Sequence, residues 1–259
     1  MKPINLYQIA DKIAPFALSK EYCERYGAYD NSGVILDFGE ELTGVVFSLD
    51  CSTLAIEEAK KQGANCIFTH HPAIFSPVRS ICVGGTAANI AACARAGISV
   101  ISAHLNLDCA QGGVDDCLMH GLGGKAAESV MHPLREGGYG KVYSVVPTPL
   151  EAFVGGAQKE FGTRRTVVYG NRPVGKIASF CGAGMDDASV NFAVGSGADT
   201  VVSSDAKHHL LSALIEAGLN VVLLTHYAAE NYGFMKFGEK IKSKISGVPA
   251  YFVTDERLL

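Results

Sequence analysis

The chain has 259 residues, nearly half of them apolar, and a formal net charge of −4 at pH 7. This length allows one large domain or two small ones. The charge balance provides no basic face for nucleic acid, and the chain has neither a signal-peptide pattern nor an apolar run of the ~18 residues that a membrane span needs. We therefore predict a soluble, cytoplasmic protein that binds neither membranes nor nucleic acid.

Eight cysteines are scattered along the chain, and none forms a Cys-x-x-Cys pair. Several lie inside apolar segments, as Cys66 and Cys181 do. Cysteines of this kind are typical of small buried thiols in a reducing compartment. This interpretation is favoured over a thiolate zinc site.

The first half alternates short apolar segments with helical patterns, which is typical of an α/β sheet. Strands are expected at residues 45–49, 65–69 and 99–103. Helices are expected at residues 52–62 and 86–96, and Ser52 is a suitable N-cap for the first of them.

The second half repeats this order of elements. Strands are expected at residues 141–146, 166–169, 175–180, 200–203 and 220–224. Helices are expected at residues 150–161, 185–196, 207–217 and 228–245. The last helix carries an apolar stripe at helical spacing, which predicts a core face: Phe234, Phe237, Ile241 and Ile245.

A glycine-rich stretch at residues 132–140 is expected to join the two halves. We predict an α/β fold of two similar, interlinked halves with mixed sheets flanked by helices, divided into residues 1–131 and 132–259. The alternative that the last helix packs back on the first half stays open.

Ionisable side chains gather where the predicted strands end, and this is where open α/β sheets bind ligands. They are Asp50, His70, His71, His104, Asp108, Asp205, Lys207, His208, His209, His226 and Glu230. Any one of these histidines alone is more typical of capping or hydrogen bonding. Together, imidazoles and carboxylates form a ligand set suited to zinc, manganese, iron, cobalt or nickel.

Three pairs carry this hypothesis. His70 and His71 are neighbours on an extended segment, so their side chains diverge and could each reach a different ion. Asp108 follows His104 by four residues and is a candidate ligand, with His104 either a ligand or a residue that orients one. The third pair, His226 and Glu230, shares a helix face, and the alternative to ligation there is a solvated surface.

Four segments in this order resemble the NIF-three-like family, whose members are often catalogued as GTP cyclohydrolase I type 2 homologues. The segments are Thr69–Pro72, His104–Asp108 with Gly113–Asp116, Asp205–His209, and His226–Glu230. The resemblance covers almost the whole chain. One departure is Asp115, which stands where the family pattern usually has Asn.

The resemblance implies a dinuclear metal site where the two halves meet. By motif position its ligands would be His70, His71, Asp108, His226 and Glu230. Glu230 would bridge both ions, with His71 and Asp108 on one ion and His70 and His226 on the other. The family is also similar in forming homo-hexamers, which makes further copies of this chain the expected partners.

A pair of ions about 3.5–4 Å apart suits hydrolysis. We therefore expect a metal-dependent hydrolase for an unidentified small-molecule or nucleotide substrate, with His104 and Asp205 as catalytic proton shuttles. A non-catalytic, metal-binding hexameric scaffold or metal-handling protein is the alternative, because it would use the same ligands. A third interpretation, an α/β domain with purely structural histidines, predicts no bound metal.

Overall fold

The computed structural model describes residues 1–82, 84 and 87–259. These form two compact units, and the first consists of residues 1–110 with 234–255. The second consists of residues 111–233 with 256–259. The predicted division of the chain at residue 131 stays a prediction.

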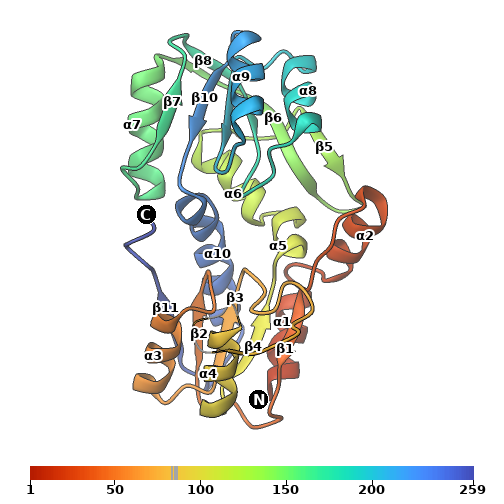
Figure 1. Ribbon diagram of the computed structural model, residues 1–259, viewed down its shortest axis with the longest axis vertical. Helices are drawn as coiled ribbons and strands as arrows, with labels where there is room; N and C mark the ends of the chain where they lie inside the picture. The colour runs from red at the N-terminus through yellow and green to blue at the C-terminus, as the bar shows by residue number, and fades with distance from the viewer. Residues whose placement is uncertain (83, 85–86) are drawn as a thin grey trace. The chain divides into compact units, whose positions relative to one another are not determined.

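The first unit is built on a mixed sheet in the order β1-β4-β3-β2-β11 (Figure 1). Four strands run parallel, and β1 pairs antiparallel with β4. The strands are β1 Gly33–Leu36, β2 Val45–Ser48, β3 Cys66–Thr69, β4 Ser99–Ser102 and β11 Ala250–Val253. Parallel order brings the carboxyl ends of β2, β3 and β4 to one edge of the sheet.

The two faces of this sheet carry different apolar layers because successive strand residues point to opposite sides. On one face, Val46, Ile67 and Val100 pack in a buried cluster with residues of the helices α3 Thr53–Gln62 and α4 Ala88–Ala96. On the other face, Phe47 and Phe68 stack on each other with ring centroids 5.6 Å apart.

The expected first helix is confirmed as α3, with the Ser52 side chain accepting a hydrogen bond from the Ala55 amide. The second expected helix is α4, and its predicted start at Thr86 lies outside the described residues. Three further helices were not predicted: α1 Pro3–Asp11, α2 Ala17–Tyr26 and α5 Leu105–Cys109.

The second unit contains a mixed sheet in the order β5-β6-β8-β9-β10-β7. Strands β8, β9 and β10 are parallel, and the others pair antiparallel. The strands are β5 Ser129–Pro133, β6 Gly138–Thr148, β7 Val167–Tyr169, β8 Val174–Ser179, β9 Thr200–Ser203 and β10 Asn220–Leu223. The glycine-rich stretch 132–140 belongs to the β5–β6 hairpin.

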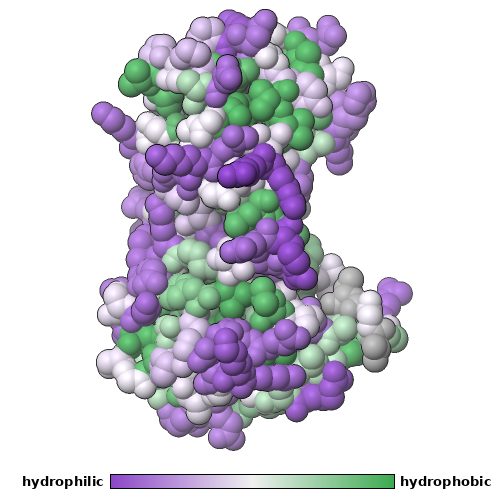
Figure 2. Space-filling view, turned by 90° about the vertical axis from the view of Figure 1, so that its left-hand side faces the viewer, coloured by the Kyte–Doolittle hydropathy of each residue, from purple (hydrophilic) through white to green (hydrophobic). Residues whose placement is uncertain are grey.

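The helices of the second unit are α6 Val114–Gly121, α7 Leu150–Phe161, α8 Asp187–Gly195 and α9 His208–Glu216. Mixed sheets flanked by helices are thus confirmed in both units (Figure 1). On the face drawn in Figure 2, hydrophilic residues are interspersed with hydrophobic ones on each unit. Within the described residues, the helices include none that is long and apolar enough to span a membrane.

Helix α10, His226–Lys242, begins in the second unit and ends in the first. Gly233 packs against α6 so closely that a Cβ there would lie 2.8 Å from Val114 Cα. Within the first unit, Phe234 and Phe237 pack beside Phe47 and Phe68. The predicted apolar stripe is buried, which confirms it as core, although α10 ends at Lys242 and Ile245 lies beyond it.

Candidate metal centre

The His70–His71 segment continues β3 beyond Thr69. Both histidine amides donate to the Leu49 carbonyl, at 3.1 and 3.0 Å. The Thr69 hydroxyl also donates to the His71 carbonyl at 2.8 Å. These bonds fix the backbone from which the two imidazoles project.

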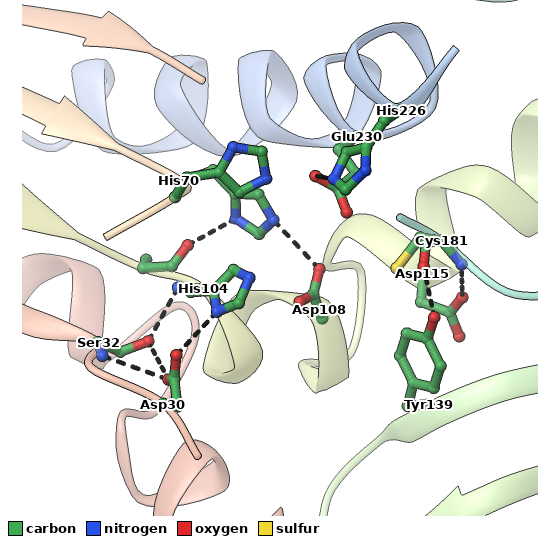
Figure 3. Close-up of polar contacts among 12 residues, drawn as sticks. Asp30, Ser32, His70, His104, Asp108, Asp115, Tyr139, Cys181, His226 and Glu230 are labelled. Atoms are coloured by element: carbon green, nitrogen blue, oxygen red, sulfur yellow. Dashed lines mark hydrogen bonds and ion pairs between the residues drawn. The ribbon is translucent and has the colours of Figure 1, made fainter. Parts of the chain in front are cut away.

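The His70 imidazole is fully buried and oriented by two oxygens (Figure 3). Its Nδ1 lies 2.7 Å from the Ala103 carbonyl, and its Nε2 lies 3.3 Å from Asp108 Oδ1. A carbonyl can only accept, so Nδ1 carries a proton, and in a neutral imidazole Nε2 holds the lone pair. Asp108 itself is 4 % exposed, on the short helix α5.

His71 is held in the same way by a carboxylate. Its Nδ1 lies 2.6 Å from Asp50 Oδ1, and Asp50 follows β2, the strand beside β3. Since the carboxylate accepts the Nδ1 proton, Nε2 is again the nitrogen that holds the lone pair in a neutral ring.

His104 follows β4 and bonds to a buried carboxylate. Its Nδ1 lies 2.8 Å from Asp30 Oδ1, and its amide donates to the Ser32 hydroxyl at 2.9 Å (Figure 3). Burial alone would lower the pKa of His104, but the Asp30 hydrogen bond and the charges of Asp108 and Asp30 raise it above the ordinary value. Burial would raise the pKa of Asp30, yet the hydrogen bonds and charge of His104 lower it to about 2.

These three histidines form a group of candidate metal ligands. One nitrogen from each of His70, His71 and His104 lies within 4.8 Å of the others. The prediction that the strand exits of the first half bring imidazoles and carboxylates together is therefore correct for this unit. Asp108 lies against His70, whereas the resemblance paired Asp108 with His71.

The second unit carries the remaining predicted ligands in the first turns of α10. His226 Nε2 lies 2.9 Å from Glu230 Oε2, as the four-residue spacing predicts. His226 Nδ1 lies 2.7 Å from Asp205 Oδ2, so a carboxylate orients this imidazole too. Glu230 is 3 % exposed, which excludes a fully solvated helix face for it.

Gly182 packs against the side chains of Glu230 and His226. It lies in the turn after β8 with a φ of +58°, and a Cβ there would overlap Glu230 Oε1 and lie 3.3 Å from His226 Nε2. The Asp205 amide donates to its carbonyl at 3.3 Å. A side chain at this position would therefore displace the carboxylate.

A buried ion pair supports the same turn and was not predicted. Asp115 is fully buried and accepts hydrogen bonds from the Lys141 ammonium at 2.7 Å and from the Cys181 amide at 3.3 Å. Burial would lower the pKa of Lys141, but the charges of Asp115 and Asp116 raise it well above the usual range. The only sequence signal for this pair was Asp115, which stands where Asn was expected.

Other predicted exit residues do not join these groups in the described structure. His208 and His209 are exposed in the first turn of α9. His120, which was not assigned to a strand exit, bonds to the Gly124 carbonyl at 2.9 Å. Asp30 was missed, because neither β1 nor its preceding loop has a pattern that marks it.

The fold and these side chains define an α/β protein of two units that carries buried imidazole and carboxylate groups suited to a divalent metal. The family model described as Duf34/NIF3 (NGG1p interacting factor 3) matches residues 1–257. The chain therefore belongs to this family, as the sequence resemblance predicted.

Individual relatives agree with this assignment. The chain is 30 % identical to a Clostridium perfringens protein named GTP cyclohydrolase 1 type 2 homolog, over 99 % of this chain and 97 % of the relative. Reduced HcgD from Methanocaldococcus jannaschii is a similar solved structure, with 26 % identity, a TM-score of 0.80 and coverage of 98 % of each chain. A Bacillus cereus protein related to NIF3 shares the fold, with a TM-score of 0.83 at 19 % identity over 99 % of this chain and 97 % of that one.

Proposed function

We propose that the chain binds two divalent metal ions and uses them in hydrolysis. The observation that carries the proposal is common to four histidines, His70, His71, His104 and His226. In each of them Nδ1 lies within 2.8 Å of a carbonyl or carboxylate oxygen. An oxygen acceptor on Nδ1 orients a metal-binding imidazole and makes its Nε2 a better ligand.

The proposed ligands are His70, His71, Asp108, His226 and Glu230. The contact between His70 and Asp108 supports placing these two on one ion. His71 and His226 would then serve the second ion, which revises the pairing that the resemblance implied. Glu230 would bridge the ions, since a carboxylate has two oxygens to offer.

Helix α10 carries the two remaining residues of the proposed ligand set, His226 and Glu230. The helix is continuous from His226 to Lys242. Glu230 and Phe234 are four residues apart on it and therefore share a face. The Phe234 ring lies 6.1 Å from the His70 imidazole, centroid to centroid.

The donor set fits a borderline divalent cation, because imidazole nitrogen and carboxylate oxygen suit zinc, manganese, iron, cobalt or nickel. When bound, the ions would supply Lewis acidity and a water of lowered pKa. His104, with its Nδ1 fixed by Asp30, would take up and release a proton at Nε2. Asp205 orients His226, and its exposed carboxylate could exchange protons with solvent.

The proposed substrate is a small molecule or nucleotide, and the name GTP cyclohydrolase 1 type 2 homolog, which several relatives carry, supports a nucleotide as first choice. The alternative is a metal-binding scaffold without catalytic activity, assembled as a homo-hexamer. The absence of disulfides among the described cysteines is compatible with the cytoplasmic location that we propose for either function.

Metal analysis of protein purified without added metal tests the ligand set. About two equivalents per chain are expected for the natural sequence, with a clear loss in Glu230→Gln. His209→Ala is the matched control, because His209 is an exposed histidine outside the proposed site. The same protein is then incubated with excess divalent metal and desalted, and a metal content that is still near zero would contradict the proposal.

Turnover separates the two functions. The metal-loaded protein is incubated with GTP, phosphoesters and cyclic amides, and product release is followed in the natural sequence and in His104→Gln. Metal-dependent release that is lost in His104→Gln, with metal content unchanged, supports the hydrolase. Full metal occupancy without any product supports the scaffold.

A further inference from the structure

Two cysteines of the first unit lie in contact beside the candidate metal centre. The sulfur atoms of Cys51 and Cys93 are 3.7 Å apart. Cys51 comes directly after Asp50, between β2 and α3, and Cys93 lies on α4. Cys51 is partly exposed, whereas Cys93 is fully buried in the apolar cluster under the sheet.

A side chain of α4 holds residue 51 in this position. The Asn89 amide group donates to the Cys51 carbonyl at 2.8 Å. Asn89 and Cys93 are four residues apart on the helix and so share the face that meets Cys51. The contact between the two sulfurs is therefore fixed by a second, independent bond between the same segments.

We propose that Cys51 and Cys93 form a reversible disulfide that weakens the hydrogen bond between His71 and Asp50. A disulfide has a sulfur separation of about 2.05 Å, so the two atoms need to approach by only about 1.7 Å from their present 3.7 Å. Cys51 must make most of this movement, because Cys93 is part of a packed helix and Cys51 lies in a connection between elements.

A small disulfide such as oxidised glutathione is a sufficient oxidant. The Cys51 thiolate attacks it, forms a mixed disulfide and releases one glutathione thiolate. The Cys93 thiolate then attacks the Cys51 sulfur and displaces the second glutathione. Two cysteine thiols are oxidised and one glutathione disulfide is reduced to two thiols, with both cysteine protons passing to the released thiolates.

Exposure sets the order of attack, and the pKa of Cys51 sets its rate. The oxidant reaches Cys51 because this residue is partly exposed, and it does not reach the buried Cys93. The hydrogen bond to Cys93 and burial raise the pKa of Cys51, so the first attack is slow near neutral pH and faster at higher pH.

The consequence for the metal centre rests on the proposed function. Asp50 precedes Cys51 in the chain and bonds to His71 Nδ1 at 2.6 Å. Movement of residue 51 toward α4 draws the Asp50 carboxylate with it and loosens this bond. Loss of such a partner costs a metal site about 10–100-fold in affinity, so oxidation is expected to weaken metal binding.

The first experiment asks whether the disulfide forms. The metal-free full-length protein is incubated with oxidised glutathione, alkylated, digested without reduction and analysed by mass spectrometry. A peptide linking Cys51 to Cys93 is expected in the natural sequence. It is also expected in the control Cys82→Ser, which removes an exposed cysteine outside the proposed pair. It must be absent from Cys51→Ser and disappear with dithiothreitol. A glutathione adduct on Cys51 without the link would overturn the proposal.

The second experiment asks whether the disulfide reaches His71. The imidazole NMR signal of His71 is assigned by comparison with His71→Gln. It is expected to shift on oxidation of the metal-free natural sequence, and to keep its position when Cys51→Ser is treated in the same way. An unchanged signal in the cross-linked protein would refute the coupling.

Zinc affinity, measured by competition with a chromophoric chelator, is then expected to fall about 10-fold on oxidation. Equal zinc affinity of the reduced and oxidised forms would also refute the coupling. If the reduced protein binds no zinc, the proposed function fails, while the cross-link and the His71 signal still decide this inference.

Discussion

Substitution of Gly182 by alanine tests whether the position of the Glu230 carboxylate in the second unit is needed for metal binding. The added Cβ would overlap Glu230 Oε1 and lie 3.3 Å from His226 Nε2. The carboxylate must therefore move away from the imidazole with which it is paired. We expect Gly182→Ala to lose metal affinity by at least about 10-fold, the effect typical of a disturbed ligand environment.

Alanine at Gly182 also introduces backbone strain, and a matched glycine corrects for it. Gly182 has a φ of +58° and Gly197 one of +68°, but a Cβ at Gly197 would meet no atom within 4 Å. Each variant should lose about 1–2 kcal/mol of stability from the left-handed conformation. This corresponds to a fall in Tm of about 2–4 °C for each kcal/mol.

The assay combines thermal unfolding in chelator with zinc titration of both variants. Only Gly182→Ala should lose zinc affinity, because only its Cβ meets Glu230. If Gly182→Ala and Gly197→Ala bind zinc equally well, the reasoning about Gly182 is refuted.

Three further predictions follow from single contacts. Asp50→Asn should weaken zinc binding about 10-fold in a chelator competition, with unfolding of the metal-free protein little changed; unaltered affinity would argue against His71 as a ligand. Lys141→Met should cost about 3–5 kcal/mol in urea unfolding, because it leaves the buried Asp115 carboxylate without its cation; Lys176→Met, at a more exposed pair, should cost under about 1 kcal/mol. The folded pKa of Asp30, about 2, lies below its ordinary value of 3.8, so this carboxylate stabilises the fold above pH 4, and the contribution disappears as the pH falls from about 4 to 2. In urea unfolding of the metal-free protein, the free energy of unfolding of Asp30→Asn should therefore fall by about 2 kcal/mol less between pH 4 and pH 2 than that of the natural sequence. Identical pH profiles for the two proteins would contradict this prediction.

Much of the fold could be predicted from the sequence because its strands are short apolar runs with helices after them. Strand β9 matches its predicted range, 200–203, and α7 matches 150–161. The missed elements have weaker local patterns. Strand β11 begins just after the last predicted helix, 228–245, and its identity as a strand depends on pairing with β2, far away in sequence.

The candidate site was predictable to the extent that strand ends concentrate polar residues. His70, His71 and His104 follow neighbouring strands and do meet. The residues that orient them were harder to find. Asp30 and the Ala103 carbonyl have no motif of their own, and they become partners only when β1 pairs with β4 and β4 with β3. Lys141 was hidden for the same reason, since its contact with Asp115 joins two distant segments.

Anomalous diffraction from crystals grown with zinc tests most directly whether two ions share the five proposed ligands. We expect two zinc peaks, with His70 and Asp108 on one and His71 and His226 on the other, and with Glu230 reaching both at zinc–ligand distances of about 2.0–2.2 Å. Zinc bound away from these residues, or a zinc-replete crystal with no peak beside His70 and His71, would contradict the account.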